Sequence, residues 1–158
     1  MQFIVILITL LLAICSESCY SQPEIIWQRC FGGTASDGFQ DAQKTLDGGY
    51  ICLGSSSSED FDLQDVCCWP GAPDFWIVKL DSNFNIEWQK LIGSNVAGDI
   101  PANIFCNPDT SYTIFGQVGS NTDDCLCNHS SSQDIWMIIV DEIGNIISQK
   151  CFGGSSYD

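Results

Sequence analysis

The sequence predicts an all-β fold made of tandem four-stranded repeat units that are β-propeller-like, with about two units in the chain. The first observation is a repeat: W-Q-R-C-F-G-G at Trp27 returns 61 residues later as W-Q-K-L-I-G-S at Trp88, and 60 residues after that as S-Q-K-C-F-G-G at Ser148. The second is that the matching positions are mainly Trp, Tyr, Gly and Asp, which are typical of strands and turns. Self-similarity at a fixed period indicates an architecture in which each unit buries its apolar face against its neighbours.

A signal peptide is expected at residues 1–21. Residues 3–14 form an apolar run of 12, which is too short to span a bilayer comfortably. The small residues Cys19 and Ser21 precede a possible cleavage site before Gln22. A membrane anchor is the alternative interpretation. We therefore expect an exported protein, secreted or at the cell surface, that is not an integral membrane protein once the leader is removed.

The first unit, residues 22–87, carries three clear strand signals. Asp47, Gly48 and Gly49 form a tight turn before one strand, and runs of β-branched and aromatic residues joined by a polar link of hairpin length predict the other two. These predicted strands are 50–53, 76–80 and 86–92. The segment 39–46 is ambiguous between a strand and a short helical turn, and 55–73 is a long loop.

The second unit, residues 88–147, repeats these signals, including a strand at 136–140, and 148–158 begins a truncated third unit. About four strands in a unit of roughly 60 residues favour a propeller blade over a β-solenoid or a two-sheet sandwich. Two units cannot close a ring that usually takes four to eight blades. We therefore expect the chain to be a fragment lacking further repeats, or to assemble with other copies.

Eight cysteines remain after the leader, and an even number in an exported chain is typical of disulfides. The disulfide candidates are Cys30, Cys52, Cys67, Cys68, Cys106, Cys125, Cys127 and Cys151. Their pairing cannot be derived from the sequence. A thiolate metal site at the paired loop cysteines 67–68 and 125–127 is the alternative, although these spacings are tighter than those of a usual zinc knuckle.

The formal charge of −15, from 20 acidic and five basic residues, excludes nucleic acid as an expected partner because the surface repels phosphate. Such a surface suits calcium, a cationic ligand or simple solubility. Asp60, Asp62 and Asp65 form an acidic loop that could supply several of the oxygens that calcium needs. The alternative is a solvated acidic loop, and no other cofactor is indicated.

The remaining polar and aromatic candidates point to structure more than to catalysis. Asp37 and Asp99 recur beside small residues, which favours side-chain bonds that hold a turn over a catalytic carboxylate pair. The tryptophans in strand runs are expected in the core, whereas Trp69 has no aromatic counterpart in the next unit and is the candidate for an exposed ligand contact. His129 is the only histidine, so we see no catalytic constellation and do not expect an enzyme.

Three segments together resemble a known group: W-Q-R-C-F-G-G-T-A-S-D, T-L-D-G-G-Y-I-C-L-G-S-S-S-S and D-F-W-I-V-K-L-D-S-N-F-N-I-E-W-Q-K. They look like the tandem repeat of about 60 residues found in secreted bacterial proteins of the Bacteroidota type, often associated with type IX secretion. The resemblance covers residues 25–158. It implies an exported, propeller-like repeat whose ligand is mostly unassigned.

These observations predict an exported repeat module with a binding or scaffold role outside the cell or on its surface. Its ligand would be a protein or a glycan, contacted by long loops on a rigid frame. The alternative is a fragment of a carbohydrate-active propeller enzyme.

Overall fold

The computed structural model describes residues 23–64, 72–93, 98–119 and 133–154, and it divides into a part up to Cys30 and a part from Phe31 onwards. The described residues of the first part, 23–30, have no regular secondary structure. The expected signal peptide lies outside the described residues. Among the residues described, no helix is long and apolar enough to cross a membrane.

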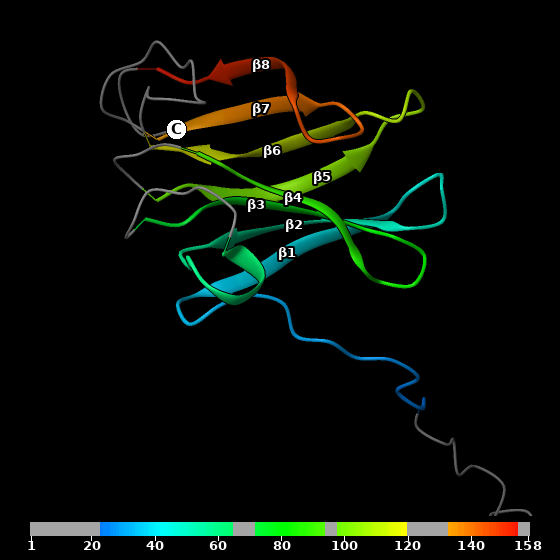
Figure 1. Ribbon diagram of the computed structural model, residues 1–158. Coiled ribbons are helices and arrows are strands. Elements are labelled where there is room, and N and C mark those ends of the chain that lie inside the picture. The colour runs from blue at the N-terminus through cyan, green and yellow to red at the C-terminus, as the bar shows by residue number, and fades with distance from the viewer. Residues whose placement is uncertain (1–22, 65–71, 94–97, 120–132, 155–158) are drawn as a thin grey trace, which may run out of the picture. The chain divides into compact units, whose positions relative to one another are not determined.

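The second part is all-β, as predicted, and its described residues form two antiparallel four-stranded sheets (Figure 1). The first sheet has the order β1-β2-β3-β4, with strands β1 (Asp37–Lys44), β2 (Tyr50–Ser56), β3 (Asp74–Leu80) and β4 (Ile86–Ile92). The second has the order β5-β6-β7-β8, with β5 (Ile100–Cys106), β6 (Tyr112–Val118), β7 (Asp134–Val140) and β8 (Ile146–Phe152). A short 3-10 helix, η1 (Phe61–Leu63), lies in the loop between β2 and β3.

Within the ambiguous segment 39–46, residues 45 and 46 follow the end of the strand and residues 39–44 belong to strand β1. Its pairing with β2 shifts between Phe39 and Asp41, so Gln40 is an extra residue in the strand. Such a bulge interrupts the alternation of apolar and polar residues by which a strand is recognised in sequence. The repeat motifs at Trp88 and Ser148 lie in the last strands, β4 and β8, so the predicted unit boundaries at 87/88 and 147/148 fall inside these strands.

Each sheet has two faces, which we name after one residue of its third strand: the Phe75 and Trp76 faces in the first sheet, and the equivalent Ile135 and Trp136 faces in the second. The Phe75 face of the first sheet packs against the Trp136 face of the second, and strand β5 lies against β1, β2 and β3. The core between them is made of fully or nearly fully buried residues: Ile51, Leu53, Phe75, Ile77, Ile92, Ile104, Tyr112, Ile114, Val118, Trp136, Ile138 and Val140.

This contact brings the backbone of β6 close to an aromatic ring of the first sheet. A Cβ atom on Gly116 would lie 2.3 Å from Cζ of Phe75, so a side chain at position 116 would collide with the ring. The glycine therefore permits the close approach of the two sheets.

A second core covers the Trp76 face of the first sheet. It consists of Cys52, Trp76, Val78, Leu80 and Leu91 from the strands, with Leu63 of η1 packed against them. All seven residues of β3 are consequently buried. The Ile135 face of the second sheet is different, because several of its apolar side chains are exposed.

Candidate functional site

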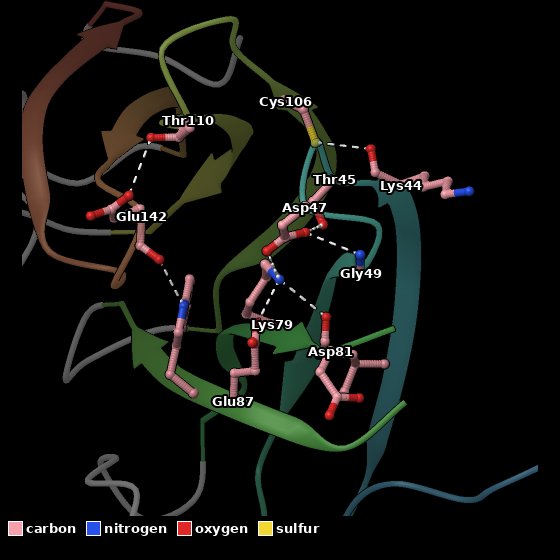
Figure 2. A network of polar contacts seen from close by, with 12 residues as sticks. Lys44, Thr45, Asp47, Gly49, Lys79, Asp81, Glu87, Cys106, Thr110 and Glu142 are labelled. Atoms are coloured by element: carbon pink, nitrogen blue, oxygen red, sulfur yellow. Dashed lines mark hydrogen bonds and ion pairs between the residues drawn. The ribbon is translucent and has the colours of Figure 1, made fainter. Parts of the chain in front are cut away.

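A cleft of about 330 Å³ lies where the two sheets meet, at the end that carries their turns. The β1–β2 turn contributes Asp47, the β5–β6 turn contributes Thr110 and the β7–β8 turn contributes Glu142. Lys79 of β3 and Glu87 of β4 add two charged side chains to its lining. Figure 2 shows the contacts that these side chains make, with Asp47 beside Lys79 and Thr110 beside Glu142.

Lys79 is the centre of the polar network, and only 3% of its side chain is exposed. Its ammonium donates hydrogen bonds to Oδ2 of Asp47 at 2.7 Å, to Oε2 of Glu87 at 2.6 Å and to the carbonyl of Leu80 at 3.1 Å. These contacts use all three ammonium hydrogens. Burial opposes the charge, but the bonds to the two carboxylates outweigh it and raise the pKa of Lys79.

Asp47 is fixed by its own turn as well as by the lysine. Its Oδ1 accepts a hydrogen bond from the hydroxyl of Thr45 and one of 3.0 Å from the backbone N–H of Gly49. The bond from Lys79, followed by these two, lowers the pKa of the Asp47 carboxyl far below its ordinary value. The carboxylate is therefore held ionised and in one orientation at the edge of the cleft.

The ion-pair network belongs to the first unit alone. Lys79 corresponds to Ile139 in the second unit and Glu87 corresponds to Ile147, so both partners are replaced together by isoleucine. Asp47 corresponds to Asp109, which keeps the turn bonds, accepting from the hydroxyl of Ser111 at 2.6 Å. The aspartate therefore has a turn role common to both units, and the first unit adds the lysine and the glutamate.

Trp88 ties the first sheet to the turn of the second. Its indole Nε1 donates a hydrogen bond of 2.8 Å to the carbonyl of Glu142, and its ring lies 6.3 Å from that of Tyr112. The ring also packs against Gly144, which has a φ of +84° and would place a Cβ 2.8 Å from the indole. Trp88, Tyr112 and Glu142 all line the cleft, so these contacts fix one of its walls.

Two of the calcium candidates, Asp60 and Asp62, are not among the residues that line this cleft. The carboxylate of Asp60 accepts bonds from the N–H and hydroxyl of Thr34 at 2.8 and 2.9 Å, and Oδ2 of Asp62 accepts one of 3.1 Å from the N–H of Gly32. Asp65 lies outside the described residues, as does Trp69. Within the described ranges, no group of three or more His, Cys, Asp or Glu side chains could hold a metal ion. Calcium binding in this loop stays a prediction.

The disulfide expectation is wrong for three cysteines, because Cys30, Cys52 and Cys106 are free thiols. Cys52 is buried in the second core, and burial raises its pKa to about 11. Cys106 lies at the cleft and donates a weak bond of 3.6 Å to the carbonyl of Lys44. Cys151 is disulfide-bonded, with a partner outside the described residues. The other candidates, Cys67, Cys68, Cys125 and Cys127, also lie outside them.

Asp37 and Asp99 make side-chain bonds to groups near the ends of neighbouring strands, and one of these bonds is local in sequence. The carboxylate of Asp37 accepts a bond of 2.7 Å from the N–H of Gly33 and one of 2.8 Å from the hydroxyl of Ser58. Asp99 accepts a bond of 3.1 Å from the N–H of Gly119.

Sequence reasoning missed Lys79 and its partners. The available signal was a single cation in an otherwise apolar run, D-F-W-I-V-K-L-D, set against D-I-W-M-I-I-V-D in the second unit. A lone charge in a strand that is buried on both faces requires partners, and these had to come from a turn and a neighbouring strand. No protein family matches the sequence, and no curated protein is similar to it.

Proposed function

We propose that this chain is an exported, propeller-like repeat module that binds a protein or glycan ligand outside the cell. The propeller-like arrangement is supported by the way the two equivalent sheets pack, with the Phe75 face of one on the Trp136 face of the next. Blades of a propeller stack in the same head-to-tail sense. Export is supported by the apolar run at residues 3–14 and by the resemblance to secreted repeats.

The observation that carries the binding role is the cleft lined by turns of both units. Its polar side is rich in hydrogen-bond acceptors, because Asp47, Glu87 and Glu142 all bring carboxylates to it. Its rim has two exposed apolar side chains, Leu46 and Ile143. A few fixed polar groups beside apolar surface are typical of ligand sites.

The acceptor-rich lining favours a ligand that donates hydrogen bonds. Sugar hydroxyls meet this requirement, and so do the ammonium and guanidinium groups of a basic peptide. Because Lys79 is fully engaged with Asp47, Glu87 and a carbonyl, it provides no donor to the ligand. Its role in this proposal is to position the two carboxylates.

The test is a glycan array and a basic-peptide array probed with the wild-type chain, a Glu142→Gln variant and a Phe61→Ser control. Phe61 is exposed on η1 and does not line the cleft, so its replacement should leave binding unchanged. Loss of at least tenfold in affinity in Glu142→Gln alone would support the cleft, since a charge-assisted bond contributes about 1.5–3 kcal/mol. Equal binding by all three proteins would reject it, and hydrolysis of a bound glycan would favour the carbohydrate-active enzyme instead.

A further inference from the structure

The Ile135 face of the second sheet is an apolar surface without a covering layer among the described residues. Phe105, Ile135 and Phe152 on this face are between 42% and 50% exposed, and Phe115 and Met137 are partly exposed. The rings of Phe105 and Phe115 contact each other edge to face, with centroids 6.1 Å apart, so these side chains form one patch. A sheet that permanently faces water normally alternates apolar and polar residues. In this sheet the Trp136 face is covered, and the Ile135 face still carries large apolar side chains on β5, β6, β7 and β8.

The equivalent face in the first sheet is completely covered. Phe75 and Ile77 occupy the positions of Ile135 and Met137, and both are 0% exposed beneath the second sheet. The second sheet is even more apolar than the first at one position, since Lys79 of the first unit is replaced by Ile139 in the second. The second sheet therefore has the composition of a covered face at the positions where the first sheet is covered.

The charge distribution points to another copy of the same chain as the partner. The protein carries 20 acidic residues and a net charge of −15, so two copies repel each other over most contacts. Along β6, β7 and β8, the residues that alternate onto the Ile135 face include no Asp or Glu: Thr113, Phe115, Gln117, Ile135, Met137, Ile139, Ser148, Lys150 and Phe152. The one charged residue in that set, Lys150, places its ammonium 4.8 Å from the centroid of the Phe152 ring. This face is where like-charge repulsion between copies is least.

The covered faces decide the symmetry of the contact. In the internal packing, a Phe75-type face is covered by a Trp76-type face of the next sheet, but the Trp76 face of a second copy is already occupied by its own Leu63. The Ile135 face of one copy is then left to meet the Ile135 face of the other. A contact made by the same surface on both partners is two-fold symmetric and ends at a dimer.

The size of the face sets the expected strength. Strands about 4.8 Å apart with a rise of about 3.3 Å per residue give a four-stranded face of roughly 450 Å² in plan. That area is comparable to the largest surface patch that a monomer usually exposes, about 300–600 Å², and two such faces bury less than a standard stable interface. A dissociation constant in the range of about 1–100 μM is expected for such a contact.

We propose that the Ile135 face is a dimer interface between two copies of this chain. The test is sedimentation equilibrium of the chain without its leader, carrying Cys30→Ser so that an exposed free thiol cannot cross-link copies. Ile135→Glu places an acidic group on the face of an acidic protein, Ile135→Gln adds polarity without charge, and Phe61→Glu places the same charge on an exposed residue of η1. We expect the parent and Phe61→Glu to dimerise alike, Ile135→Gln to dimerise more weakly, and Ile135→Glu to weaken dimerisation at least tenfold.

Three results would overturn the proposal. A parent that stays monomeric up to about 1 mM would show that the face does not pair with itself, since an affinity that weak is less than a specific interface provides. Assemblies that keep growing with concentration would indicate a head-to-tail contact through a different surface. A dimer that survives Ile135→Glu, in a variant whose circular dichroism and melting temperature match the parent, would place the interface elsewhere.

Discussion

The buried network around Lys79 leads to a prediction about stability, and the second unit provides its control. Glu87→Ile removes a hydrogen bond of 2.6 Å from an ammonium whose side chain is 3% exposed. Bonds to charged groups contribute about 1.5–3 kcal/mol, and the lost bond leaves Lys79 with one carboxylate partner in place of two. Because Glu87 itself is half-exposed, the new isoleucine regains little by burial. We expect the free energy of unfolding to fall by about 2 kcal/mol.

The double variant Lys79→Ile/Glu87→Ile reproduces the pair Ile139 and Ile147 that the second unit carries at the same positions. Replacing a buried ion pair by apolar residues of similar size is often neutral, so its stability should lie within about 1 kcal/mol of the parent and above that of Glu87→Ile. Urea unfolding measures this directly, because 2 kcal/mol moves the midpoint by roughly 1 M at a slope of about 2 kcal/mol per M.

The matched control is Glu142→Ile. Glu142 is an exposed acidic residue of the same cleft, and its carboxylate accepts a long bond of 3.4 Å from the hydroxyl of Thr110. Its replacement should change stability by less than about 0.5 kcal/mol. If the double variant loses as much stability as Lys79→Ile and Glu87→Ile lose when added together, the two charges are not coupled and the account of the buried network is wrong.

Three further outcomes follow from the same contacts. Because the pKa of Asp47 is lowered and that of Lys79 is raised, the stability that each contributes is present between about pH 4 and 10. It is lost in acid as Asp47 is protonated and in base as Lys79 is deprotonated. In Lys79→Ile, the loss of stability in base, measured as the urea midpoint against pH, should therefore shrink. Burial raises the pKa of Cys52 to about 11, so iodoacetamide at pH 8 should modify the exposed Cys30 rapidly and Cys52 only on unfolding. Peptide mapping that finds Cys52 modified as fast as Cys30 in the folded protein would contradict this. Gly116→Ala would place a Cβ 2.3 Å from a buried ring and should lower the melting temperature by several degrees, whereas Gly38→Ala, with no atom within 4 Å, should not.

The strands were the part of the fold most accessible to the sequence. Runs such as 76–80 and 136–140 contain β-branched and aromatic residues between turn formers, and both lie in strands, β3 and β7. Segment 39–46 resisted interpretation because the bulge at Gln40 interrupts its alternation. Local patterns therefore identify regular strands well and irregular ones poorly.

The cleft was not accessible in the same way, because its side chains are brought together by tertiary packing. Asp47 and Lys79 are separated by 32 residues, and Trp88 meets the carbonyl of Glu142 across 54 residues. The repeat predicts that two similar sheets exist, but it does not specify which face of one meets which face of the other. The disulfide prediction did not hold for Cys30, Cys52 and Cys106, because the number of cysteines says nothing of where each one lies; Cys52, for example, lies among the apolar side chains of the second core.

The difference between the two units argues that the charged network serves the cleft more than the fold. Stability alone does not require Lys79 and Glu87, since the second unit forms the same hairpin with Ile139 and Ile147. What the lysine adds is orientation, because it holds the carboxylates of Asp47 and Glu87 at 2.7 and 2.6 Å on the wall between the sheets. The proposed binding role therefore predicts that Lys79→Ile/Glu87→Ile folds as well as the parent but binds its ligand at least tenfold more weakly. A double variant that is stable and binds normally would show that the charged network and the isoleucine pair are only two ways of packing the same hairpin. It would remove the main support for ligand binding in the cleft.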